Sequence, residues 1–297
     1  MDHVAQMMGE GAEGASVEPE PAAPDLPAVA VPSPHVGDGA TLSRCVIHWL
    51  LENGGVATAF QPIIDVRRHR VIGWEALLRA QHPEIGAISP VALVESADQH
   101  RLLDVLTRRV VADAWTTMAE ARDLVTEPLT IHLNLELSQL DVDQPLLRWL
   151  AAIVWPDDVR VLVEVTERGG DQWLPEHEAA AEILTASGYG LAIDDCGAGS
   201  SRLGFLKSRG WDVVKLDRLL LADGGRREFL VLRHVVEMLA SLGTLSLAEG
   251  VETVEQYVAV RDLGVDEAQG YLLGMPVPGP VMLTALAKDG LDVELEL

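Results

Sequence analysis

Polar residues that end short apolar runs recur at regular intervals along this chain, and they constrain its fold strongly. Asn134, Glu164 and Asp194 each follow a run made mostly of Val, Leu, Ile or Ala, and 30 residues separate each of them from the next. That interval is about one strand plus one helix, and the intervening segments have helical apolar spacing. Such alternation indicates parallel strands with helical crossovers, either as a closed barrel or as an open doubly wound sheet.

The expected elements follow this alternation. Strands are expected at residues 56–64, 71–78, 129–133, 159–163, 191–193, 211–214 and 245–248. Helices are expected at residues 42–50, 102–121, 146–154, 176–186, 227–242, 252–263 and 281–287. The link at residues 65–70 is short enough to join the first two strands as an antiparallel hairpin.

The number of strands that end in a chemically useful residue favours the barrel. The series comprises Glu75, Asn134, Glu164, Asp194, Asp195, Lys215 and Glu249. The carboxyl ends of all barrel strands converge on one mouth, whereas an open sheet concentrates its site at one switch point. A single residue of this kind is most simply a solvated strand end, but a series on successive strands argues against that reading.

The residue types in the series indicate a metal site. Glu75, Asn134, Glu164 and Asp194 offer only oxygen ligands, which suit Mg²⁺ or Mn²⁺ better than zinc. Asp195 stands next to Asp194 and is placed to serve a second ion, since two such ions promote displacement at phosphorus. Lys215 adds a positive charge for the attacking water or the phosphoryl group. His132 precedes Asn134 by two residues and faces the same side; we expect it to pack or hydrogen-bond rather than bind metal.

Composition limits the possible partners. The chain has 297 residues, of which 48% are hydrophobic, enough for one large core. Its formal net charge of −24 repels nucleic acid polymers and anionic membranes, so a phosphate-bearing ligand needs local positive charge. Two cysteines cannot form a disulfide framework, and no apolar run approaches the ~20 residues of a membrane span. Without a signal peptide pattern, the expected location is the cytoplasm.

Residues 1–40 differ from the rest of the chain. They are rich in Ala, Pro, Glu and Gly and contain no Lys or Arg. Such a segment buries too little apolar area to offset its chain entropy, so we expect a disordered acidic leader. The alternative is a tail that binds a protein partner. Residues 41–297 are expected to form one domain.

The motifs resemble those of the EAL-domain phosphodiesterases of bacterial cyclic di-GMP signalling, from about Phe60 to Pro276. They read Phe60-Gln61-Pro62-Ile63, Glu75-Ala76-Leu77-Leu78-Arg79, Asn134-Leu135, Glu164-Val165-Thr166-Glu167, Asp194-Asp195, Lys215-Leu216-Asp217, Glu249-Gly250-Val251-Glu252-Thr253 and Gln269-Gly270-Tyr271. The resemblance implies an α/β fold, a modified TIM (β/α)8 barrel with one antiparallel strand. It also implies hydrolysis of cyclic di-GMP to the linear dinucleotide 5′-pGpG, two Mg²⁺ or Mn²⁺ ions and a homodimer.

The same resemblance assigns roles by position. The implied metal ligands are Glu75, Asn134, Glu164, Asp194 and Asp195. The implied catalytic residues are Lys215, Glu249 and Glu75. The implied substrate contacts are Gln61, Leu77, Arg79, Asp217, Glu252 and Gln269. Glu167 resembles the residue that supports the loop after the paired aspartates.

Two departures from the family pattern bear on activity. The loop at residues 196–202 lacks both large aromatics that the family usually has there, and Glu136 stands where Ser is common. These changes motivate an alternative, a weak or inactive domain that acts as a cyclic di-GMP receptor. A third hypothesis is a protein-interaction scaffold that acts through the leader. Because every expected ligand and the lysine are present, an active phosphodiesterase is favoured.

Overall fold

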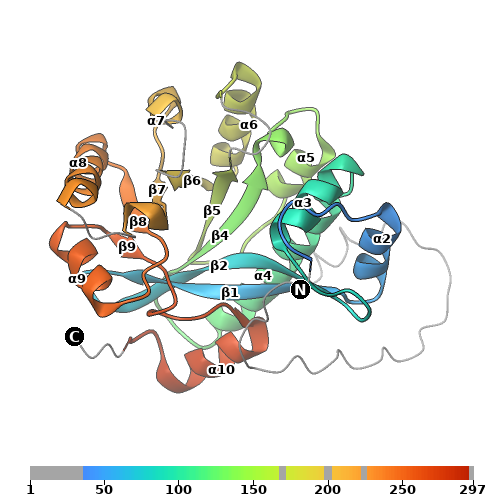
Figure 1. Ribbon diagram of the computed structural model, residues 1–297, viewed down its shortest axis with the longest axis horizontal. Coiled ribbons are helices and arrows are strands. Elements are labelled where there is room, and N and C mark those ends of the chain that lie inside the picture. Colours follow the sequence, from blue (N-terminus) through green and yellow to red (C-terminus); the bar gives the residue numbers. More distant parts are fainter. Residues whose placement is uncertain (1–35, 167–171, 197–202, 222–225, 294–297) are drawn as a thin grey trace.

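A computed structural model describes residues 36–166, 172–196, 203–221 and 226–293 (Figure 1). Most of the predicted leader, Glu167 and most of the departing loop at residues 196–202 lie outside these ranges, as does the side chain of Asp195. Within them, no helix is both long and apolar enough to cross a lipid bilayer.

Eight strands close into a barrel, which confirms the predicted fold class. They are β1 (Val56–Asp65), β2 (Arg70–His82), β4 (Leu129–Glu136), β5 (Val159–Thr166), β6 (Gly190–Cys196), β7 (Val213–Leu216), β8 (Leu245–Ala248) and β9 (Glu267–Ala268). Neighbouring pairs from β2 to β9 are parallel. β1 pairs antiparallel with both β2 and β9 and so closes the ring. The predicted hairpin between the first two strands is therefore confirmed.

Two further strands extend the barrel at its edge. β3 (Gly86–Ile88) pairs antiparallel with the end of β2, and β10 (Val277–Pro278) pairs antiparallel with β1. The strand expected at residues 211–214 lies instead at Val213–Leu216, so Lys215 belongs to the strand rather than following it. Trp211 precedes the strand, and its indole Nε1 donates a hydrogen bond to the backbone oxygen of Phe205, 2.8 Å away.

Helices surround the strands (Figure 1). The barrel crossovers contain α4 (Leu103–Arg122), α5 (Pro145–Ala151), α6 (Pro175–Ala186), α7 (Leu203–Ser208), α8 (Arg226–Leu242) and α9 (Val254–Asp262). The remaining helices are α2 (Arg44–Glu52), α3 (Pro90–Gln99) and α10 (Gly279–Asp289), with short 3-10 turns η1 (Leu137–Gln139) and η2 (Arg218–Leu220). α3 was not predicted, although Ser89 caps its first turn and Pro90 begins it.

Three apolar clusters lie among the described residues, and two of them form layers on the two faces of the barrel. The larger layer packs the outer face of the barrel against the helices. The smaller layer fills the barrel interior and consists of Ile63, Leu162, Ala192, Val213 and Leu247, all of them buried. A Leu, Ile or Val side chain removed from water contributes about 1.5–3 kcal/mol. The interior is thus largely a packed core, and most of the polar site residues lie above it, toward the carboxyl ends of the parallel strands.

Candidate active site

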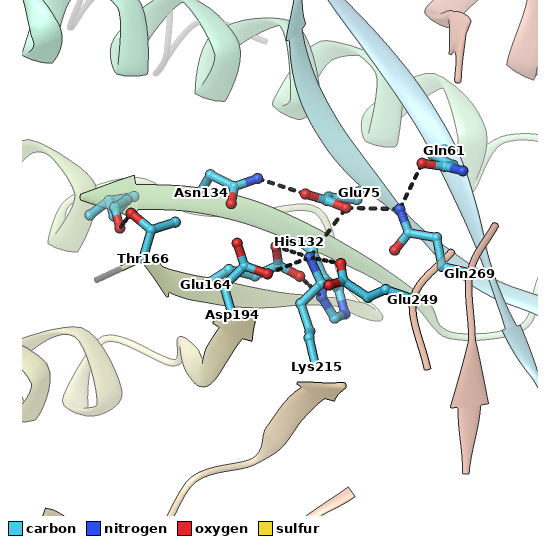
Figure 2. A network of polar contacts seen from close by, with 11 residues as sticks. Gln61, Glu75, His132, Asn134, Glu164, Thr166, Asp194, Lys215, Glu249 and Gln269 are labelled. Atoms are coloured by element: carbon cyan, nitrogen blue, oxygen red, sulfur yellow. Dashed lines mark hydrogen bonds and ion pairs between the residues drawn. The ribbon is translucent and has the colours of Figure 1, made fainter. Parts of the chain in front are cut away.

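Side chains from around the barrel converge at the carboxyl ends of its strands (Figure 2). The group consists of Gln61 on β1, Glu75 on β2, Asn134 on β4, Glu164 on β5, Asp194 on β6, Lys215 on β7, Glu249 after β8 and Gln269 after β9. All eight were predicted site residues, and the structure brings them into one network. Gly270 lets the segment after β9 approach closely, because a Cβ there would lie 2.2 Å from backbone atoms of Val251.

Lys215 lies at the centre of the network. Its Nζ is 2.8 Å from Glu164 Oε2, 2.8 Å from Glu249 Oε1, 3.0 Å from Asp194 Oδ1 and 3.4 Å from Glu75 Oε2. The side chain is almost completely buried. Burial alone lowers the pKa of a lysine, but the surrounding carboxylates outweigh it and raise the pKa of Lys215 well above its usual value. The ammonium therefore stays charged at neutral pH.

Glu75 is held by hydrogen bonds at both oxygens. Asn134 Nδ2 donates to Oε1 over 2.7 Å, and Gln269 Nε2 donates to Oε2 over 2.8 Å. Gln269 also donates to Gln61 Oε1 over 3.0 Å, which links both ends of the barrel sheet. Burial raises the pKa of Glu75, but Lys215 and the two amide donors outweigh it and lower the pKa to about 2. This carboxylate is ionised throughout the physiological range.

Glu164 is fully buried and contacts a partner on each side. Its Oε2 binds Lys215, and its Oε1 lies 2.6 Å from His132 Nδ1. Burial and the charge of Glu75 raise the pKa of Glu164 well above its usual value. Burial lowers the pKa of His132 to about 4, so this imidazole is neutral at pH 7. The hydrogen bond of His132 confirms one of the two roles expected for it.

The network has more negative than positive side chains. Four carboxylates face one ammonium, and in a buried setting such an excess favours binding of a further cation. Asp194 Oδ1 is buried and makes no well-aligned hydrogen bond among the described residues, although Lys215 Nζ is near. Together with the all-oxygen donor set, this fits Mg²⁺ or Mn²⁺.

Among the described residues, no three His, Cys, Asp or Glu side chains form a group that holds a metal ion. The reason is visible in the contacts: the Lys215 ammonium lies among the oxygens, and Asn134 turns its amide nitrogen toward Glu75. Binding an ion at these residues requires the amide of Asn134 to turn its oxygen inward.

Two cavities meet at the network and share Glu75, Leu77 and Asp194. The larger, about 480 Å³, has an apolar wall supplied chiefly by α3 and α4: Pro90, Val91, Val94, Leu103, Leu106 and Val110. The smaller, about 290 Å³, has a charged wall: Lys215, Arg218, Glu249 and Glu252. The apolar wall was not predicted, because α3 was missed.

Arg79 lines the larger cavity and keeps an available donor. Its Nη1 donates to the backbone oxygen of Leu78 over 2.8 Å, while its Nε is buried without a hydrogen-bond partner among the described residues. Glu136 lines the same cavity, and its carboxylate also caps η1. A guanidinium with an unused N–H beside a cavity is suited to an anionic ligand.

The remaining predicted substrate contacts have different surroundings. Glu252 lines the smaller cavity, and Leu77 lies where the two cavities meet. Asp217 accepts a hydrogen bond from the backbone N–H of Leu219 over 2.7 Å and so caps η2. Asp217 is not among the described residues that line either cavity, and its contact with substrate stays a prediction.

The EAL domain family model matches residues 45–276 of the chain. Probable cyclic di-GMP phosphodiesterase PdeN of Escherichia coli is 32% identical over 231 residues, covering 74% of this chain and 43% of PdeN. The EAL domain of Mycobacterium smegmatis DcpA is 28% identical with a TM-score of 0.64, covering 78% and 98% of the two chains. Klebsiella pneumoniae BlrP1, in a manganese/cy-diGMP complex, is 28% identical with a TM-score of 0.62, covering 76% and 57%. The chain spans less than half the length of PdeN and of two other curated relatives.

Proposed function

The chain belongs to the EAL domain family, and from this premise we propose that it hydrolyses cyclic di-GMP to 5′-pGpG with Mg²⁺ or Mn²⁺. The observation that carries the proposal is the charged Lys215 among four carboxylates at the point where two cavities meet. The name of PdeN and the contents of the BlrP1 complex support the choice of substrate and of metal.

The two cavities suit the two halves of a cyclic dinucleotide. The apolar wall of the larger cavity offers Val91, Val94 and Leu106 to the face of a base, which is an apolar contact. Arg79 contributes the donor for a phosphate oxygen in the same cavity. Such local positive charge is needed because the whole chain carries a formal net charge of −24.

Glu75, Asn134, Glu164 and Asp194 are the residues that would hold the first ion, and Asp195 the residue for a second. When bound, the ion polarises a phosphoryl oxygen and lowers the pKa of a water molecule. Because these residues come from four neighbouring strands, the barrel fixes their mutual positions before any ligand enters.

Lys215 and Glu249 have different roles in the proposed reaction. The charged Lys215 cannot accept a proton, so it orients the attacking water and stabilises charge on the phosphoryl group. Glu249 lies 2.8 Å from Lys215 and lines the smaller cavity, which places its carboxylate to accept a proton from the attacking water. The water oxygen forms a bond to phosphorus, the bond from phosphorus to the 3′-oxygen breaks, and the water proton passes to that oxygen.

The test is hydrolysis by the purified chain. Cyclic di-GMP is incubated with Mg²⁺ or Mn²⁺ and separated from 5′-pGpG by chromatography; we expect 5′-pGpG to accumulate. Glu75→Ala should lose activity, whereas Glu84→Ala, at an exposed glutamate outside both cavities, should keep it. Cyclic di-GMP that stays intact with both metals overturns the proposal. Measurable binding without hydrolysis would favour the receptor alternative instead.

Three predictions concern the protein beyond its site. A homodimer, a protein partner for residues 1–40 and a cytoplasmic location remain predictions from sequence and resemblance. The first is checked by light scattering of the purified chain, for which we expect twice the mass of 32.1 kDa.

A further inference from the structure

Two polar side chains interrupt the apolar interior of the barrel. His132 and Glu267 are both buried, and Leu162 and Leu247 of the interior layer pair with them in the neighbouring strands. Aliphatic residues at both positions would continue the layer without burying polar atoms. Their presence beneath the mouth therefore calls for a role other than packing.

Among the described residues, the His132 side chain makes one hydrogen bond, and it is directed toward the site. Its Nδ1 contacts Glu164 Oε1 over 2.6 Å, while Lys215 Nζ contacts the other oxygen of the same carboxylate over 2.8 Å (Figure 2). Both oxygens of the Glu164 carboxylate are therefore held, Oε1 by His132 and Oε2 by Lys215. If an ion displaces the ammonium, His132 is the contact that still fixes the plane of the carboxylate.

The second ring nitrogen of His132, Nε2, differs from Nδ1 in its surroundings. His132 Nε2 is buried without a hydrogen-bond partner among the described residues, and so is Glu267 Oε2. An imidazole that donates from Nδ1 and is neutral is an acceptor at Nε2, and an ionised Glu267 carboxylate is an acceptor too, so the two atoms do not satisfy each other. The contact with Glu164 is therefore the hydrogen bond that orients the ring among the described residues.

We propose that His132 is a positioning residue that orients the carboxylate of Glu164 for metal binding through the 2.6 Å contact between its Nδ1 and Glu164 Oε1. The proposal rests on the proposed function, because it assumes that Glu164 is a metal ligand. A carboxylate that binds a metal accepts hydrogen bonds, so Nδ1 is the donor in this contact. Partners of this kind around a metal ligand typically change metal affinity 10- to 100-fold when removed.

The test compares two replacements of His132 in the full chain. Asparagine keeps a nitrogen donor on the γ carbon, as in the imidazole, whereas leucine keeps bulk and loses the donor. Binding of Mn²⁺ is measured by isothermal titration calorimetry, and thermal unfolding is measured in EDTA. We expect His132→Leu to weaken Mn²⁺ binding 10- to 100-fold and His132→Asn to remain within a few-fold of wild type.

The outcomes separate this proposal from the function on which it rests. If wild type binds Mn²⁺ and hydrolyses cyclic di-GMP but His132→Leu binds equally well, only the positioning role fails. Equal losses in His132→Asn and His132→Leu, matched by equal losses of thermal stability, would also overturn it in favour of packing. If wild type itself binds no Mn²⁺, both the proposed function and the positioning role fail.

Discussion

The two cavities at the barrel mouth differ in what their walls offer. The larger presents aliphatic side chains from α3 and α4 with Arg79 as its cation, and the smaller presents Lys215 and Glu249 with further charged groups. Among the described residues, Glu75, Leu77 and Asp194 belong to both. Under the proposed function, we expect the larger cavity to recognise the ligand and the smaller to carry out its chemistry. Changes on the two sides should therefore affect different measurements.

Removal of the metal should produce the largest effect, and it should act on the chemistry of the smaller cavity. With EDTA we expect hydrolysis to fall to background, because four carboxylates and one ammonium cannot replace a divalent ion. An ion that binds only the folded state at 100 times its Kd stabilises it by about 2.7 kcal/mol. Adding Mn²⁺ back should raise the thermal midpoint and restore 5′-pGpG formation. Turnover that persists in EDTA would contradict the metal site.

Lys215→Met should come next in size. It removes the ammonium that contacts four carboxylates and leaves their charge unbalanced. We expect kcat to fall about 10²- to 10³-fold, as when one electrostatic donor is lost. Affinity for cyclic di-GMP, measured by calorimetry with Mn²⁺ present, should change far less. A large loss of affinity with unchanged kcat would place Lys215 on the recognition side instead.

Arg79→Ala tests the recognition side. A hydrogen bond to a charged group contributes about 1.5–3 kcal/mol, which corresponds to roughly a 10- to 100-fold rise in KM. We expect kcat to stay within a few-fold, because Arg79 is not among the described residues that contact Lys215 or Glu249. A drop in kcat with constant KM would contradict the assignment of ligand recognition to the larger cavity and of chemistry to the smaller one.

Val94→Ser should have the smallest effect. Val94 is half-buried in the apolar wall, and a hydroxyl there weakens contact with a base by a few-fold. The matched control is Val105→Ser, since Val105 lies on α4 but is exposed and does not line the cavity. Affinity for cyclic di-GMP in EDTA isolates the wall from the metal. Equal effects of the two variants on affinity would show that the apolar wall does not contribute to ligand binding.

The sequence predicted most residues of the network because they follow successive apolar runs, whereas Gln61 and Gln269 were predicted only from the family resemblance. Because parallel strands end at one mouth of a barrel, Glu75, Glu164 and Asp194 converge there. The position of Lys215 was less well predicted, because the strand begins two residues later than expected and therefore contains Lys215.

The apolar wall and the interior pair were harder to predict. α3 is an Ala-, Ser- and acid-containing segment whose only strong signal is its cap, so its contribution to a cavity was missed. His132 shows period-two spacing with Asn134, but that spacing cannot distinguish a histidine that fills space from one that holds Glu164. β9 has only two residues, too few for a periodic pattern, although it carries Glu267 and precedes Gln269.

The short pairing between β1 and β9 has a consequence for synthesis. Only Ile64 with Ala268 and Asp65 with Glu267 join these strands, and the hydrogen bond from Gln269 to Gln61 lies across the same seam. During synthesis Gln61 and Glu75 leave the ribosome early, and about 200 further residues are added before their partner, Gln269, is present. A nascent chain that ends before Gln269 lacks the amide that holds Glu75, and one that ends before Glu267 also lacks the strand that closes the barrel. The network around Glu75 is therefore completed only when the barrel closes, so we expect shorter translation products to lack the proposed activity.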